Sequence, residues 1–508
     1  MKTILAALAL IPATAAAQAP VADTQSGRVR GTSTAGVETF RGIPFAAAPV
    51  GANRWRAPQP AGRWRGVRDA TAFGADCMQK PFESDAAPLG TAPAEDCLFV
   101  NVWRPAGTRP GAKLPVVVWV YGGGFVNGGA SPAVYDGSAF ARAGVMFVSF
   151  NYRLGRFGFF AHPALAAEGR VANWGLLDQQ AALRWVQRNA RRFGGDPAAV
   201  TVVGESAGGR SVLALLGTPA AKGLFARAVV MSGGGRTLLD AAPDAASEAA
   251  TAFAATQGIE GTGSDALARL RALPPERVID GLNLATLGKA SATFAGAATD
   301  GVTVTGTAEE VLRAGRQAKV PVMVGATSAD IGWLPAETKD ALFATFGPHS
   351  PAARAAYDPD GTAPLSALVA AAGADRQMAE PARFVAARVT AGGQPAYYYR
   401  FSYVGDAMRG EWKGAPHATD IPYFFDTVAA KYGAALTPRD AAMARAVNAY
   451  VVGFAKTGVP QANGFPAWPA FAGKGPLMDF AASDEPVVGP DPWQARLDAT
   501  EAVAERQR

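Results

Sequence analysis

The 508-residue sequence predicts an α/β protein with a central, mostly parallel sheet flanked by helices. Strand-like and helix-like stretches alternate from about residue 111 to residue 403 without an evident seam, as in chains of βαβ units. Hydrophobic residues make up 49% of the chain and charged residues 18%, which is enough to build a large core. No fixed-period repeat or long polar linker divides the chain. We therefore expect a single α/β domain over residues 18–508, with large cap insertions.

The first 17 residues predict a cleavable secretory signal peptide. Lys2 precedes an apolar run at residues 4–11, and a small-residue stretch ends at Ala17. A membrane anchor is the weaker interpretation, because the apolar run is too short to span a bilayer and Pro12 interrupts it. We expect cleavage after Ala17 and a secreted or periplasmic mature protein that is not inserted in a membrane.

The chain has two cysteines, Cys77 and Cys97. In an oxidising compartment, an isolated pair this close in sequence favours a disulfide over a metal site or a catalytic thiol. Two unpaired buried cysteines are the alternative. No other residues have metal-ligand spacing, so neither a metal nor a cofactor is expected.

The net charge of +6 is spread along the chain without a run of five basic residues. A nucleic-acid-binding protein would need a clustered basic face with interleaved aromatic residues, and none is visible. The charge therefore indicates solubility and surface potential, and it leaves the oligomeric state open.

An apolar strand is predicted at residues 114–120, and Tyr121-Gly122-Gly123-Gly124-Phe125 follows it. Taken alone, the glycine triplet is compatible with a phosphate-binding loop or a flexible turn, but the flanking residues of those motifs are missing. Glycines after a central strand also expose backbone amides, which can stabilise negative charge that develops on an oxygen atom.

Ser206 is the strongest candidate for a nucleophile. It lies in Gly-Glu-Ser-Ala-Gly at residues 204–208, between an apolar run at 200–203 and a helix-forming run at 211–216. A strand-to-helix nucleophile elbow needs small residues on both sides of the serine, and Gly204 and Gly208 meet that need. The Ala207 amide would then join those of Gly123 and Gly124 in an oxyanion hole.

A serine nucleophile needs a general base, and the chain has three histidines. His162 lies in a phenylalanine-rich stretch, and His349 lies in a loop before an alanine-rich helix. His417 follows the strand-like run at 397–401 by a loop, which is where the base of an α/β-hydrolase is attached. We therefore select His417.

The residue that orients the histidine should be a carboxylate at the end of the preceding strand. Such a strand is predicted at residues 319–325, and Asp330 follows it. The chain order Ser206, Asp330, His417 is the order of the α/β-hydrolase fold. Asp300, in a turn sequence, and Asp420 are the competing acids, and both are interpreted as structural.

Together these residues resemble the type-B carboxylesterases, the cholinesterase-like branch of the α/β-hydrolases, and indicate a secreted bacterial member. Further motifs in the same order carry the resemblance over most of the chain: Phe-Arg-Gly-Ile-Pro-Phe at 40–45, Glu-Asp-Cys-Leu at 95–98, Asn-Tyr-Arg at 151–153, Asn-Trp-Gly-Leu-Leu-Asp-Gln at 173–179 and Phe-Gly-Gly-Asp-Pro at 193–197. The resemblance implies a serine esterase that hydrolyses small carboxylic esters through an acyl-enzyme.

Several residue roles are implied by this resemblance. Cys77 would pair with Cys97 in the family's amino-terminal disulfide loop, and Arg54–Glu95 and Arg153–Asp178 would be ion pairs that brace the scaffold. Asp330 takes the place where most members have Glu. Glu205, beside the nucleophile, either tunes the site electrostatically or has a structural role.

The sequence also departs from the family. The loop from Cys77 to Cys97 contains no tryptophan, so choline esters are poor candidate substrates. Ile331 and Ala418 replace the glycines that usually follow the acid and the histidine.

Phe125, Trp174 and Trp333 are candidate walls of the substrate pocket, with core packing as the competing interpretation, and Glu205 is a fourth candidate for this pocket. The natural ester is left open. A lipase would need an apolar lid; the insertions at residues 233–319 and 333–394 are alanine-rich enough for cap helices but show no strongly apolar flap. A non-catalytic binding protein on the same fold would be expected to lack the serine or the histidine.

Overall fold

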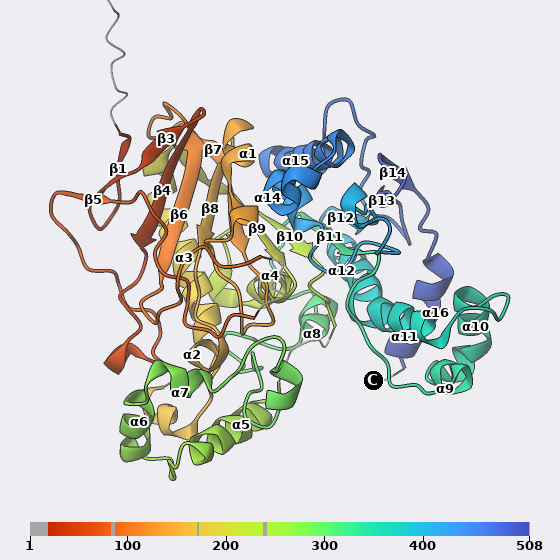
Figure 1. The fold of residues 1–508 in the computed structure, drawn as a ribbon, viewed down its shortest axis with the longest axis horizontal. Helices are drawn as coiled ribbons and strands as arrows, with labels where there is room; N and C mark the ends of the chain where they lie inside the picture. The colour runs from red at the N-terminus through yellow and green to blue at the C-terminus, as the bar shows by residue number, and fades with distance from the viewer. Residues whose placement is uncertain (1–18, 83–86, 170–171, 237–240, 507–508) are drawn as a thin grey trace, which may run out of the picture.

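The computed structural model describes residues 19–82, 87–169, 172–236 and 241–506. Its centre is a mixed sheet in which eleven strands of the described chain are ordered β14-β13-β12-β11-β10-β9-β7-β8-β6-β4-β3 (Figure 1). The strands are β3 (Thr32–Thr34), β4 (Val37–Pro44), β6 (Phe99–Pro105), β7 (Leu114–Val120), β8 (Met146–Phe150), β9 (Gly195–Glu205), β10 (Arg227–Met231), β11 (Val322–Thr327), β12 (Ala396–Phe401), β13 (Leu477–Phe480) and β14 (Pro486–Gly489). The expected α/β architecture is confirmed.

The middle of the sheet is parallel, from β13 across to β8, and both ends are antiparallel. Every residue of β8, β11 and β12 is buried. Consecutive buried residues require cover on both faces, which explains why these strands are mostly apolar and do not alternate between apolar and polar residues. The predicted strand at 114–120 matches β7, whereas the strand predicted at 319–325 begins and ends later, as β11.

Two separate groups of helices cover the sheet. One group contains α1 (Ser138–Arg142), α13 (Ile421–Phe424), α14 (Val428–Tyr432) and α15 (Pro438–Thr457). The other contains α4 (Ala207–Gly217), α8 (Ala308–Arg313) and α12 (Glu380–Ala391): α4 contacts β9 and β10, α12 contacts β11 and β12, and α8 contacts both helices. α2 (Gly155–Gly158) and α3 (Trp174–Asn189) lie between β8 and β9 in the chain.

The two predicted insertions are helical and form separate lobes in Figure 1. The first carries α5 (Pro243–Thr256), α6 (Ser264–Arg271), α7 (Pro275–Ile279) and the short 3₁₀ helix η6 (Leu287–Ala290). The second carries α9 (Lys339–Ala344), α10 (Ser350–Tyr357), α11 (Leu365–Ala374) and the π-helical turn η8 (Asp375–Ala379), and the C-terminal helix α16 (Gln494–Ala504) packs against it.

The amino-terminal region forms a three-stranded sheet of β1 (Val21–Asp23), β2 (Arg28–Arg30) and β5 (Val67–Asp69). Cys77 and Cys97 form the expected disulfide, with their Cα atoms 4.9 Å apart. Both expected scaffold ion pairs are also present: Arg54 lies 2.5 Å from Glu95, and Arg153 lies 2.7 Å from Asp178.

The predicted signal peptide and its cleavage site lie outside the described residues, so they stay predictions. Within the described chain, no helix combines the length and apolar character needed to cross a bilayer.

Candidate active site

Ser206 occupies a tight turn between β9 and α4. Its backbone has φ 56° and ψ −122°, a combination that non-glycine residues rarely adopt, and its amide donates to the carbonyl of Met231. A Cβ atom on Gly204 would lie 2.3 Å from the carbonyl oxygen of Gly208, and one on Gly208 would lie 2.0 Å from that of Val120. The glycines that flank the serine are therefore required by close backbone contacts.

His417 and Asp330 lie side by side. Nδ1 of His417 is 2.6 Å from Oδ1 of Asp330, which fixes the orientation of the ring and leaves Nε2 to face Glu205, the residue before Ser206. His417 lies in the loop after β12, and Asp330 follows β11, the adjacent parallel strand. The neighbouring carboxyl ends of these strands bring together two residues that are 87 positions apart in sequence.

Asp330 is buried but fully hydrogen-bonded. Oδ2 accepts from the Ser232 hydroxyl at 2.6 Å and the Thr327 amide at 3.0 Å, and Oδ1 also accepts from the Ile331 amide at 2.8 Å. Burial alone would raise the pKa of Asp330, but His417 and these donors together hold that pKa below its usual value. Asp330 is therefore ionised at neutral pH and can stabilise a protonated imidazole.

Glu205 is the second carboxylate beside the histidine. Its Oε1 lies 3.2 Å from His417 Nε2, and its side chain is almost fully buried. Burial raises the pKa of Glu205, which the nearby His417 opposes. The pKa of His417 is raised as well: burial would lower it, but Glu205 and Asp330 favour the imidazolium more strongly. The described residues show no hydrogen bond between Ser206 and His417, a contact that often tightens only with substrate bound.

The glycine loop after β7 packs directly on this turn. A Cβ atom on Gly122 would lie 2.6 Å from Oε2 of Glu205 and 2.9 Å from Cβ of Ser206. Gly123 and Gly124 have φ of 103° and 61°, so the loop uses backbone conformations that favour glycine. Their amides and that of Ala207, at the start of α4, donate to no protein acceptor within the described chain. These amides are available to an oxyanion.

A single cavity of about 430 Å³ opens over these groups. This volume suits a small organic substrate. Gly123, Gly124, Glu205, Ser206 and His417 lie at its base. Its walls are mainly apolar and come from several segments: Phe82, Ala87, Val134, Tyr135, Leu284, Leu287, Ile331, Met378, Ala418, Ile421, Pro422 and Tyr432, with Lys431 beside them.

The carboxylesterase family model matches residues 18–346 and 353–491. The chain belongs to the carboxylesterase family. The fumonisin B1 esterase of Sphingopyxis macrogoltabida is 35% identical over 94% of this chain and 90% of its own length. The para-nitrobenzyl esterase of Bacillus subtilis (strain 168) is 42% identical over 62% of this chain and 63% of its own length.

Solved structures agree with this assignment. A structure of PNB esterase matches with a TM-score of 0.81 at 32% identity, covering 94% of this chain and 99% of its own. The α/β-hydrolase architecture is thereby confirmed, and this carboxylesterase is a carboxylic ester hydrolase.

The expectation of aromatic pocket walls is wrong for three residues of the carboxylesterase. Phe125 is buried and packs on Phe159 at 4.8 Å, and Trp174 is buried with its indole NH donating to the carbonyl of Phe160. Trp333 is 66% exposed and does not line the cavity. The rings of Phe125 and Trp174 are stabilised more by burial in the core than by facing a cavity. Residue type alone does not distinguish these two positions for an aromatic side chain. Of the four pocket candidates, only Glu205 lines the cavity.

The competing histidines and Asp300 do not line this cavity. His162 is buried, stacks on Phe160, and accepts a hydrogen bond from the Ala164 amide. His349 lies in the lobe of α9 to α11. Asp300 accepts from Asn173 and from the backbone of its own turn.

Asp420 is buried close to the histidine but does not contact its Nδ1, which is bound to Asp330. Burial, with Asp330 nearby, raises the pKa of Asp420 to about 7. This carboxyl is therefore a weaker candidate than Asp330 for the ionised partner of the histidine.

Sequence reasoning missed Ser232, which donates to Asp330, and most cavity walls. Ser232 follows the apolar strand β10 and has φ 44°, but no motif distinguishes it from other serines. At the two family departures, Ala418 has φ 65°, which explains the usual preference for glycine there. Ile331 is 47% exposed and lines the cavity.

The pairing of Glu205 with His417 predicts a specific pH effect. The general base acts when its imidazole is neutral, so kcat/KM should rise as pH increases through the pKa of His417. Glu205→Gln removes one of the carboxylates that raise this pKa, so the acidic limb of the kcat/KM profile should move to lower pH by about 1–3 units.

The control for this experiment is Glu248→Gln, at an exposed position on α5, which should leave the profile unchanged. An acidic limb at the same pH in Glu205→Gln and in the wild type would mean that Glu205 carries no charge in the free enzyme.

Proposed function

We propose that this carboxylesterase uses Ser206, His417 and Asp330 as a catalytic triad. The observation that carries the proposal is the strained serine turn at the base of the cavity, with His417 lining the same cavity and its Nδ1 lying 2.6 Å from Oδ1 of Asp330. In the first step, His417 takes the proton of Ser206 as its oxygen attacks the ester carbonyl. The alcohol leaves with a proton from His417, and an acyl-enzyme remains.

Water then attacks the acyl-enzyme, with His417 again acting as base, and the acid is released. The amides of Gly123, Gly124 and Ala207 stabilise the oxyanion in both steps, each by about 3 kcal/mol. Asp330 stays ionised and holds the imidazole in the required tautomer.

The mainly apolar walls and the size of the cavity favour neutral esters with short or medium acyl chains. The described part of the loop between Cys77 and Cys97 contributes Phe82 and Ala87 to the cavity.

The test is hydrolysis of p-nitrophenyl esters from acetate to decanoate by the wild-type protein. We expect a burst of p-nitrophenol equal to the enzyme concentration, followed by steady turnover with an optimum at short or medium chain length. Absence of turnover on every ester by folded protein would contradict the proposal.

A lipase-like activity on lipid esters is the second candidate. Leu284 and Ile331, which line the cavity, are 37% and 47% exposed, so part of the cavity rim is apolar. Emulsified triglycerides distinguish the two activities: a lipase would hydrolyse them faster than soluble short-chain esters, and we expect the reverse.

We also propose that the protein is exported. The signal-like sequence that ends at Ala17 and the Cys77–Cys97 disulfide support an oxidising compartment. Amino-terminal sequencing of protein collected outside the cytoplasm should begin at Gln18, and an intact Met1 would contradict export by cleavage.

A further inference from the structure

One wall of the cavity comes from an irregular turn. Met378, which is 1% exposed, lines the cavity from the π-helical turn η8, between α11 and α12. A π-helical turn is an uncommon backbone arrangement that often occurs at functional sites. Such a turn persists only when contacts with the surrounding structure stabilise it. The groups that hold η8 therefore also determine the position of Met378.

The first residue of this turn is a buried carboxylate held by the C-terminal helix. Asp375 is fully buried and accepts from Tyr357 Oη at 2.6 Å and from Arg496 Nε of α16 at 2.9 Å. The Arg496 guanidinium lies over the rings of Trp493 and Tyr357, at 4.3 and 4.8 Å from their centres. Removing the arginine would leave a buried carboxylate without its ionic partner, three residues before Met378.

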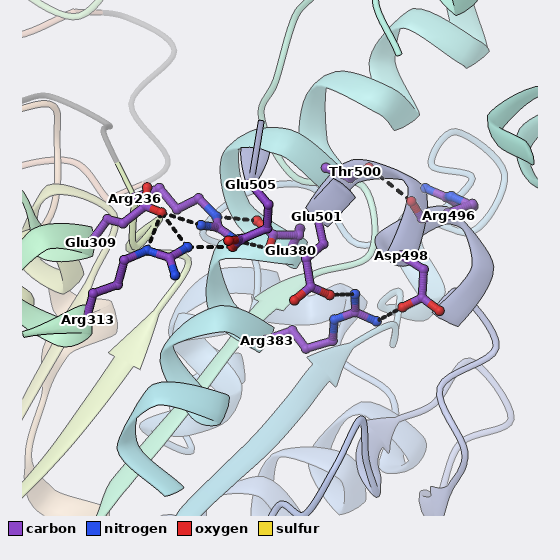
Figure 2. A network of polar contacts seen from close by, with 10 residues as sticks. All are labelled: Arg236, Glu309, Arg313, Glu380, Arg383, Arg496, Asp498, Thr500, Glu501 and Glu505. Atoms are coloured by element: carbon purple, nitrogen blue, oxygen red, sulfur yellow. Dashed lines mark hydrogen bonds and ion pairs between the residues drawn. The ribbon is translucent and has the colours of Figure 1, made fainter. Parts of the chain in front are cut away.

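α16 also binds the helix that follows the turn. Figure 2 shows Arg383 of α12 reaching Asp498 at 2.9 Å and Glu501 at 2.8 Å, both on α16. In the same figure, Glu380 at the start of α12 binds Arg236. Arg236 lies four residues after Ser232, the donor to Asp330, so the network reaches the chain segment that supports the catalytic acid.

The helix before the turn touches the loop of the catalytic acid. A Cβ atom on Gly332 would lie 2.0 Å from the carbonyl carbon of Gly373, so the two backbones are in direct contact. Gly332 follows Ile331, another residue of the cavity wall, and Gly373 lies near the end of α11. Ile331 and Met378, two residues of the cavity wall, therefore belong to one packed unit, and α16 contacts that unit at η8 and α12.

From these contacts we infer that α16 is a positioning element for the substrate cavity: its Arg496–Asp375 ion pair holds η8 and thereby sets how far Met378 narrows the cavity. Met378 is then a specificity-determining residue, and Asp375 and Arg496 are positioning residues. This inference rests on the proposed function, because it assigns the cavity to the ester substrate.

The test compares Arg496→Met with Met378→Ala in the full-length protein. Arg496→Met removes the charge and keeps an apolar side chain of similar length, whereas Met378→Ala widens the cavity directly. We expect both variants to raise the ratio of kcat/KM for p-nitrophenyl decanoate to that for p-nitrophenyl acetate at least threefold, and Arg496→Met to change kcat on acetate less than twofold. Arg388→Met, on α12 outside the network, is the control and should leave the ratio unchanged.

Amide hydrogen exchange gives a readout that does not depend on catalysis. Exchange at residues 375–379 should become faster in Arg496→Met and stay unchanged at β9. If Arg496→Met does not fold, the double variant Asp375→Asn with Arg496→Met removes the buried charge, and the same changes in ratio and exchange are expected of it.

Unchanged ratio and exchange in the folded arginine variant would overturn the role of α16, and an unchanged ratio in Met378→Ala would overturn that of Met378. If the wild type hydrolyses no ester, but amide exchange at 375–379 becomes faster in Arg496→Met, the proposed function is contradicted. The stabilisation of η8 by Arg496 is then still supported.

Discussion

Ser206→Ala should lower kcat on p-nitrophenyl acyl esters by about 10⁶-fold and abolish the burst of p-nitrophenol. The hydroxyl is the atom that becomes acylated, so its loss removes the covalent pathway instead of weakening one interaction. The residual rate should come from the oxyanion donors and from substrate binding alone. Stopped-flow absorbance at several enzyme concentrations measures the burst and the steady state in one experiment.

The alanine variant should be as stable as the wild type, because the Ser206 hydroxyl forms no hydrogen bond within the described residues and the turn geometry is imposed by the backbone of Gly204 and Gly208. Ser247→Ala on α5 is the matched control and should retain full activity. A burst of normal amplitude in Ser206→Ala would show that another residue is acylated.

Asp330→Asn should lower kcat by about 10⁴-fold with a small change in KM. All four contacts to the carboxylate come from donors or from His417 Nδ1. An amide in the same place supplies only one oxygen, so its NH₂ group must face either the imidazole or the Ser232 hydroxyl and the Thr327 amide. The imidazole of His417 then loses its ionic partner and is no longer held in one tautomer. Both losses make His417 a less effective general base.

Three further variants show whether charge or packing is responsible. Asp330→Glu keeps the charge and should retain more activity than Asp330→Asn. Ser232→Ala removes one of the hydrogen-bond donors to Asp330 and should lower kcat by about tenfold or less. Asp420→Asn tests the competing acid, and a larger loss there than in Asp330→Asn would reverse the assignment of the two carboxylates.

The catalytic turn could be predicted in detail because each of its requirements is local. The serine conformation depends on the small residues at 204 and 208 and on the strand and helix directly beside them. The glycine loop depends in the same way on the end of β7. Local backbone sterics act over a few residues, so they leave a readable pattern in the sequence.

Predicting that Asp330 pairs with His417 required one more assumption, which was the order of the strands in the sheet. Each residue lies just after a recognisable strand, but only the parallel pairing of β11 with β12 brings them within 2.6 Å. The fold supplied this pairing, and the resemblance to the family made the fold predictable.

The cavity walls could not be predicted. Leu284, Ile331 and Met378 come from two insertions and from the loop after Asp330, and no motif marks them. The aromatic residues nearest the motifs were attractive candidates, yet Phe125 and Trp174 are core residues. Whether a side chain faces the cavity or the core depends on packing between segments that are distant in sequence, and a periodic sequence pattern does not encode that packing.

The sequence by itself therefore determined the family's ester-hydrolase chemistry and the candidates for nucleophile, base, acid and glycine loop, because these depend on local backbone geometry and on side-chain type. The tertiary structure alone decided the shape of the cavity, the burial of Glu205 against His417, and the reach of α16 to the turn that carries Met378. These features arise from contacts between residues that are distant in sequence, and their energies depend on burial and distance, which exist only in the folded chain.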